Sequence, residues 1–255
     1  MPPCDHRRVQ DGPLIARFGR ARRDPQLAVL EGLHALKHAL RFGADVDEVV
    51  TVDRDALAQL ARELAADVAD EILARARPVD ARIFAELVPN PPPTGVLALA
   101  ARPPFAVRAA LCADPGSPAV LLENPRDLGN LGAAIRVSAA AGAAALVSSG
   151  SHDPWHPDAI RGAAGLHFAL PVGRVASLVE LDGSGRRLVA LDPEGDELGA
   201  GELGPGVLLA FGTERDGVSG ELLERAEARV RLPMRPGVSS LNLATAVAAA
   251  LYSLR

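Results

Sequence analysis

The stretch AVLLENPRDLGNLGAAIRVSAAAGAAALVSS at residues 119–149 decides the fold class of this chain. Apolar runs at 119–124 and 144–149 predict two strands, and the alanine-rich segment 131–143 between them predicts a helix. Two parallel strands need such a crossover, because a tight turn would make them antiparallel. The stretch therefore predicts a parallel α/β fold.

The same alternation continues toward the C-terminus. Further strands are predicted at 186–192, 206–212 and 230–234, and further helices at 156–165, 219–227 and 240–254. Apolar strands that alternate with helices are typical of a mostly parallel sheet covered on both faces.

The first hundred residues differ in composition, with apolar stretches interrupted by polar and arginine-rich segments. Leu33, Leu36 and Leu40 have helical spacing, and Gly43 is a suitable stop for that helix. The other predicted elements are strands at 48–52 and 94–101 and helices at 53–68 and 78–88.

A proline-rich segment separates the two parts. ARPPFAVRAALCADPGSP at 101–118 holds four prolines and shows little periodicity, which is typical of a linker. We predict an N-terminal domain at 13–101, a linker at 102–117 and a C-terminal domain at 118–255.

The composition excludes several classes of protein. Of 255 residues, 48% are hydrophobic and 23% charged, the balance of an ordinary globular protein. Apolar runs stay well below the roughly 20 residues of a membrane span, and the N-terminus has no apolar core of a secretory signal. Cys4 and Cys112 are too few for a disulfide framework and have no metal-ligand spacing. We expect a cytoplasmic protein without a metal site.

Charge is distributed unevenly along the chain, whose formal net charge is −5. Residues 1–42 carry eight basic and four acidic side chains, so a basic N-terminal arm precedes an acidic body. Such an arm fits an anionic partner, although a solvated N-terminal face explains the same pattern.

Common nucleotide-binding and hydrolase motifs are missing. The sequence contains no G-x-G-x-x-G, no G-x-x-x-x-G-K-[ST], no H-E-x-x-H and no G-x-S-x-G. An ordinary dinucleotide-binding fold and a P-loop hydrolase are therefore not expected. Three other segments in the C-terminal part are informative.

The first segment, ENPRDLGNLGAAIRVSAAAG at 123–142, runs from a strand through a Gly/Asn turn into a helix expected to start near Leu131. Arg136 would then lie in the second turn of this helix, where its guanidinium fork can meet a phosphate. A surface arginine on an alanine-rich helix is the ordinary structural alternative.

The second segment, FGTERDGVSG at 211–220, is a buried strand that leads into a loop with Glu214. Gly212 and Gly217 permit close backbone approaches there. Taken alone, an ordinary strand-to-helix turn explains this pattern better.

The third segment, LPMRPGVSSLNLATAVAAALY at 232–252, places a Pro-Gly turn before the last helix. Ser240 is predicted to be the N-cap of that helix. Asn242 would then lie inside the first turn, where its amide is a hydrogen-bond donor or acceptor. Capping alone is the simpler explanation of this segment.

Together, and in this order along the chain, the three segments match the motifs of one particular family. N-L-G-A-A-I-R, G-T-E-x-x-G and L-P-M followed by S-L-N resemble the signature motifs of the SpoU/TrmH-type RNA ribose 2′-O-methyltransferases of the SPOUT class. The resemblance covers about 119–254 and implies a trefoil-knotted parallel-sheet domain that binds S-adenosylmethionine, needs no metal and forms homodimers. LEG at 30–32 and GVLALA at 95–100 are similar to pieces of the small ribosomal-protein-like α/β RNA-binding domain that many of these enzymes carry.

The resemblance also implies site residues. Its cofactor positions are Phe211, Gly212, Thr213, Leu232, Met234 and Leu241. Its catalytic or substrate-binding positions are Asn130, Arg136, Glu214, Ser240 and Asn242. The chain departs from the family pattern at Leu232, where isoleucine is common, and at Arg215 and Asp216, where small residues are common.

The implied function is S-adenosylmethionine-dependent methylation of a ribose 2′-hydroxyl in RNA. Arg136 is implied either to activate the hydroxyl or to hold the adjacent phosphate. The N-terminal half favours ribosomal RNA as the substrate, and no membrane partner is expected. The alternatives are a transfer-RNA ribose methyltransferase, a catalytically silent RNA-binding protein of the same fold and, more remotely, an α/β enzyme for another nucleotide.

Overall fold

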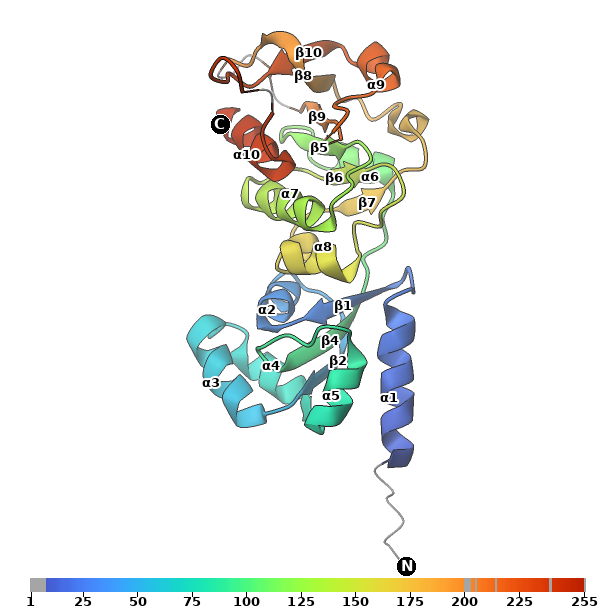
Figure 1. Cartoon of the computed structure of the whole chain (residues 1–255), viewed down its shortest axis with the longest axis vertical. Helices are drawn as coiled ribbons and strands as arrows, with labels where there is room; N and C mark the ends of the chain where they lie inside the picture. Colours follow the sequence, from blue (N-terminus) through green and yellow to red (C-terminus); the bar gives the residue numbers. More distant parts are fainter. Residues whose placement is uncertain (1–7, 200–202, 205, 214, 239, 255) are drawn as a thin grey trace, which may run out of the picture. The chain divides into compact units, whose positions relative to one another are not determined.

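The computed structural model describes residues 8–199, 203–204, 206–213, 215–238 and 240–254. The chain divides into two compact units, an N-terminal unit at Met1–Pro103 and a C-terminal unit at Pro104–Arg255 (Figure 1). In the described ranges, every helix is too short or too polar to cross a membrane.

The N-terminal unit contains a four-stranded mixed sheet. Its strands are β1 (Leu27–Glu31), β2 (Val46–Thr51), β3 (Ala76–Pro78) and β4 (Val96–Ala101). The strand order is β1-β4-β2-β3, with β4 antiparallel to both neighbours and β2 parallel to β3. The helices are α1 (Arg8–Ala21), α2 (Leu33–Arg41), α3 (Arg54–Leu64), α4 (Ala69–Arg75) and α5 (Ala81–Leu87).

The predicted elements of this unit are all present, whereas α1, β1, α4 and β3 were not predicted from the residue pattern. Local signals explain the boundaries of the predicted helices. Gly43 follows α2 in the left-handed conformation, with φ +73°. Asp53 and Asp80 cap α3 and α5 by accepting hydrogen bonds from main-chain N–H groups of the first turn.

The predicted basic arm at residues 1–42 contains α1, β1 and α2, and α1 packs into the core. Leu14 and Phe18 of α1 are buried against Phe84 and Leu87 of α5. Two of its arginines are also used inside the unit, since Arg17 and Arg22 form ion pairs with acidic side chains of the same unit. From Arg8 onward, the basic segment is therefore part of the folded N-terminal unit.

The C-terminal unit contains a six-stranded sheet in which every pairing is parallel. Its strands are β5 (Ala119–Leu122), β6 (Leu146–Ser148), β7 (Val172–Arg174), β8 (Leu188–Glu197), β9 (Leu208–Phe211) and β10 (Ala228–Arg231). The order is β10-β8-β9-β5-β6-β7. The α-helices are α6 (Val107–Cys112), α7 (Leu128–Ala140), α8 (Pro157–Gly162), α9 (Gly220–Arg225) and α10 (Leu243–Ser253). The prediction of a parallel α/β fold is confirmed.

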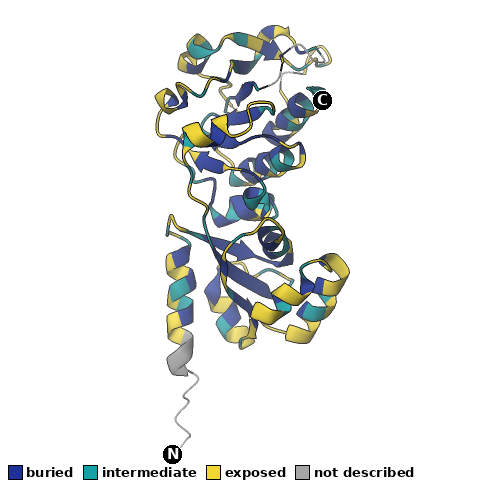
Figure 2. Cartoon of the chain, turned by 180° about the vertical axis from the view of Figure 1, so that it is seen from behind, coloured by how far each residue is buried: buried dark blue, intermediate teal, exposed yellow. Residues whose placement is uncertain are grey.

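Helices cover both faces of this sheet, so β5, β6 and β9 are buried along their whole length (Figure 2). Leu111 of α6 and Leu222 of α9 pack on one face, against Leu121 and Ala210. Val120 alternates with Leu121 along β5 and therefore faces the other side of the sheet, where it is also buried. Helices α7 and α10 lie side by side (Figure 1).

Three local expectations need correction. The segment 102–117, expected to be a linker, contains α6, because its apolar residues are buried in the core of the C-terminal unit. Helix α7 starts at Leu128, since Asp127 caps it, so Arg136 lies in the third turn rather than the second. Asn242 is the N-cap of α10, because its Oδ1 accepts hydrogen bonds from the main-chain N–H groups of the first turn, and Ser240 is not.

Candidate functional site

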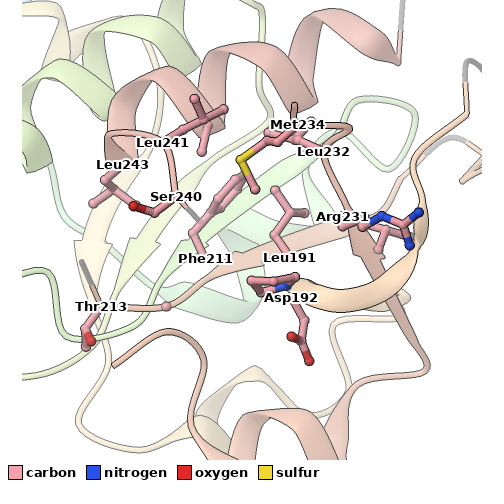
Figure 3. Close-up of a pocket in the computed structure, with 14 residues that line it drawn as sticks. Leu191, Asp192, Phe211, Thr213, Arg231, Leu232, Met234, Ser240, Leu241 and Leu243 are labelled. Atoms are coloured by element: carbon pink, nitrogen blue, oxygen red, sulfur yellow. The ribbon is translucent and has the colours of Figure 1, made fainter. Parts of the chain in front are cut away.

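A pocket lies where β8, β9 and β10 approach the start of α10 (Figure 3). Parallel strands end at one edge of their sheet, so loops that are far apart in the sequence meet there. The lining residues are Leu191, Asp192, Pro193, Phe211, Gly212, Thr213, Val230, Arg231, Leu232, Met234, Ser240, Leu241, Leu243 and Ala246.

The six predicted cofactor positions all line this one pocket, and Ser240 joins them. The second segment contributes Phe211–Thr213 from the end of β9, and the third contributes Leu232 and Met234 after β10. Sequence reasoning missed the contribution of β8, residues 191–193, because that strand carries no recognisable motif. The structure thus brings the second and third segments together around one cavity.

The turn after β9 explains why glycine stands at position 212. Thr213 and Gly217 exchange two main-chain hydrogen bonds of 2.9 and 3.1 Å, and Gly217 has φ +69°. A Cβ on Gly212 would lie 2.0 Å from the carbonyl carbon of Gly217, which is far too close. Gly212 is therefore required first by the chain's own turn, and not only by the approach of a ligand.

Two side-chain contacts connect the first and second segments. Glu123 accepts hydrogen bonds from the main-chain N–H and the hydroxyl of Ser219. Arg126 forms an ion pair of 3.2 Å with Asp216. Asp216, a departure from the family pattern, also donates its main-chain N–H to Thr213 Oγ1, so the departure is compatible with a closed turn.

Asn130 and Asn242 connect the first and third segments. Asn242 caps α10 through Oδ1 and donates its Nδ2 to Asn130 Oδ1 at 2.8 Å. Helices α7 and α10 pack against each other behind this contact. The two asparagines therefore fix the first turns of both helices relative to each other.

Arg136 does not line the pocket. Its side chain is exposed and forms no hydrogen bond or ion pair with any residue that the structure describes. The helix that carries it is firmly placed, because a Cβ on Gly132 would lie 2.2 Å from the carbonyl oxygen of Ala159 in α8. Glu214 lies outside the described residues.

The pocket has features of a site for a partly apolar small molecule. Within the described ranges, the main-chain N–H groups of Gly212, Leu232 and Met234 have no hydrogen-bond partner. Leu241 lines the cavity although 42% of its surface is exposed. The described residues contain no group of three His, Cys, Asp or Glu side chains placed to hold a metal ion. Free donors beside apolar side chains suit a ligand with both polar and apolar parts.

Comparison with known proteins gives consistent matches. The SpoU rRNA Methylase family matches residues 117–252. A 23S rRNA (adenosine(1067)-2′-O)-methyltransferase of Streptomyces laurentii is 30% identical over 243 residues, which is 88% of this chain and 84% of that protein. An uncharacterized tRNA/rRNA methyltransferase of Mycobacterium tuberculosis is 36% identical over 168 residues, 62% of this chain but only 58% of the relative's length.

Solved structures match over nearly the whole chain. The AdoMet-bound rRNA methyltransferase of Sinorhizobium meliloti has a TM-score of 0.75 at 25% identity, covering 99% of this chain and 95% of that one. The SpoU methyltransferase AviRb of Streptomyces viridochromogenes, in complex with AdoMet, has a TM-score of 0.74 at 26% identity, covering 98% and 96%. The family match covers more than half of the chain, and so this chain belongs to the SpoU rRNA methylase family.

Proposed function

We propose that the chain is an S-adenosylmethionine-dependent methyltransferase that modifies a ribose 2′-hydroxyl in RNA. One observation carries the proposal: six residues chosen from motifs in two separate segments line a single pocket with unpaired main-chain donors. The related methyltransferase of Streptomyces laurentii acts on 23S rRNA by its name, which supports ribosomal RNA as the substrate class.

The pocket fits S-adenosylmethionine. The free N–H groups of Leu232 and Met234 would hold its polar edges, and Leu241 would cover it on the exposed side. When bound, the cofactor supplies a sulfonium methyl group, which passes to the 2′ oxygen while the hydroxyl loses its proton and the sulfonium becomes a thioether. Ser240, at the pocket wall, would face the incoming ribose.

Arg136 would bind the phosphate next to the target ribose and position the 2′-hydroxyl. A guanidinium keeps its proton in proteins, so holding the phosphate suits it better than removing a proton. Its planar fork can donate hydrogen bonds to two phosphate oxygens. Holding the 2′-hydroxyl in a fixed orientation lowers the free-energy barrier of methyl transfer, because less entropy is lost in the transition state. The hydrogen bond between Asn130 and Asn242 would hold the first turns of α7 and α10 together at the site.

We also propose that the C-terminal unit contains the trefoil knot of its family and pairs with a second copy. Arg136 lies outside the pocket lining, and Tyr252 near the end of α10 is 51% exposed. A second copy that covers Tyr252 would complete the site if it brought its own Arg136 to this pocket.

The N-terminal unit would be the RNA-binding domain. Helix α2 buries Leu33 and Leu36 and carries His34, Lys37, His38 and Arg41 on its other face, where Arg41 also forms an ion pair with Asp67. Positions three and four apart form one stripe on a helix, and a basic stripe suits a phosphate backbone. Action on ribosomal RNA would place the protein in the cytoplasm.

The test is to incubate the purified full-length chain with radiolabelled S-adenosylmethionine and total RNA from a strain that lacks it. We expect label in ribosomal RNA, on a nucleotide that becomes resistant to alkaline hydrolysis at its 3′ side. Label in transfer RNA would correct the substrate class. The absence of label, with RNA still bound, would identify a catalytically silent RNA-binding protein instead.

A further inference from the structure

Arginines of the C-terminal unit mostly hold the unit together. This unit carries 13 arginines, 17 acidic residues and no lysine. Eight arginines form an ion pair with a carboxylate or donate a hydrogen bond to a main-chain carbonyl: Arg108, Arg126, Arg161, Arg174, Arg186, Arg225, Arg229 and Arg231. With an excess of acidic residues, an unpaired arginine is the exception in this part of the molecule.

Four exposed arginines have side chains without a partner among the described residues: Arg136, Arg187, Arg215 and Arg235. Three of them fall one in each motif segment. Arg187 precedes β8 at the amino edge of the sheet, whereas the pocket lies toward the carboxyl end of β9. Of the four, Arg215 and Arg235 therefore lie on the segments that line the pocket, whereas Arg136 lies on the first segment, outside the lining.

Arg215 projects from a closed turn beside the pocket. It lies two residues after the pocket-lining Thr213, inside the turn that Thr213 and Gly217 close. Its neighbour Asp216 is already engaged by Arg126 and by Thr213, which fixes the residue that follows Arg215. The exposed guanidinium of Arg215 therefore lies beside a residue that is held by two contacts.

Arg235 lies in the loop after β10, as Arg215 lies in the turn after β9. It follows the pocket-lining Met234, and its carbonyl accepts a hydrogen bond of 3.0 Å from the N–H of Val238. Gly237, with φ +89°, allows this second turn. Two turns after different strands therefore each place a guanidinium, unpaired within the described ranges, one or two residues from a pocket residue.

We propose that Arg215 and Arg235 bind backbone phosphates of the RNA strand that presents its ribose to the pocket. This inference rests on the proposed function. A guanidinium binds phosphate through a planar pair of hydrogen bonds, and the acidic body around these two residues offers RNA little other attraction. In this role both arginines bind the substrate and not the cofactor, since neither is part of the pocket lining.

The test compares R215Q/R235Q with R187Q, which removes an equally exposed and unpaired arginine at the other edge of the sheet. Affinity of the full-length chain for an in vitro transcript of 23S rRNA is measured over a series of KCl concentrations. Log K falls as log [salt] rises, and each lost phosphate contact makes this slope less steep by about 0.7 to 0.9. The slope of the double variant should therefore be less steep than that of the wild type by about 1.5. R187Q should keep the wild-type slope, and both proteins should bind S-adenosylmethionine normally by calorimetry.

An unchanged slope in R215Q/R235Q, in a chain whose wild type methylates RNA, would overturn the arginine assignment alone. An equal change of slope in R187Q would also overturn the assignment, because the slope would then depend on the total charge of the chain and not on these two positions. A wild-type chain that neither methylates RNA nor binds the transcript would overturn the proposed function together with this inference.

Discussion

The pocket and the unpaired arginines of the three motif segments differ in how they are held. The pocket is shaped by main chain that contacts main chain, as at Gly212 and Gly217, and its floor residue Phe211 is 3% exposed. Arg136, Arg215 and Arg235 are exposed and unpaired within the described structure. A preformed pocket loses little entropy when its ligand binds, whereas long free side chains become ordered only with the substrate. Variants of the two regions should therefore separate cofactor binding from RNA binding.

The largest effect is expected for Gly212→Val. Its side chain would collide with the main chain of Gly217 and Val218, so the turn after β9 must move away from the pocket. Calorimetry should detect no S-adenosylmethionine binding, while circular dichroism should still show the folded sheet. Gly220→Val is the matched control, because a Cβ there meets no atom within 4 Å. Wild-type affinity in Gly212→Val would separate this turn from the cofactor site.

Arg136→Ala should slow methyl transfer by on the order of a hundredfold or more, because a charged transition-state contact is lost. The free energy of unfolding should change by no more than about 0.5 kcal/mol, as for other exposed residues. Arg136→Lys should recover only part of the rate, since a point charge lacks the planar fork. Single-turnover rates at saturating cofactor and RNA measure this, with Arg187→Ala as control. A near-normal rate in Arg136→Ala would remove this residue from the active site.

Asn242→Ala should destabilise the C-terminal unit by about 1 to 2 kcal/mol, because it removes the N-cap of α10 and the hydrogen bond to Asn130. Asn130→Ala should also destabilise the unit, by about 1 kcal/mol, because it removes the hydrogen bond to Asn242. Urea denaturation of the two single variants and the double variant measures the coupling. Additive losses would show that the contact between the asparagines contributes nothing.

The residue pattern predicted the parallel sheet well, because buried parallel strands are short apolar runs that stand out between helices. The residue pattern did not predict the elements whose formation depends on tertiary packing. Pro13 and two glycines obscure α1, which is held instead by buried Phe18. The prolines around α6 suggested a linker, yet Leu111 anchors that helix in the core. Motifs selected the pocket residues, but the contribution of β8 depends on strand order, which the sequence does not show.

The smallest effect is expected for the ion pair between Arg126 and Asp216, which joins the first and second segments. Both side chains are more than half exposed, at 55% and 61%, so water and salt screen the attraction. A double-mutant cycle with Arg126→Ala and Asp216→Ala should give a coupling of at most about 0.5 kcal/mol in the free energy of unfolding. The turn should survive, because the main-chain bonds between Thr213 and Gly217 do not involve either side chain. A coupling well above 1 kcal/mol, or a loss of cofactor affinity in either variant, would show that the pocket depends on this exposed contact and would weaken the contrast between the two regions.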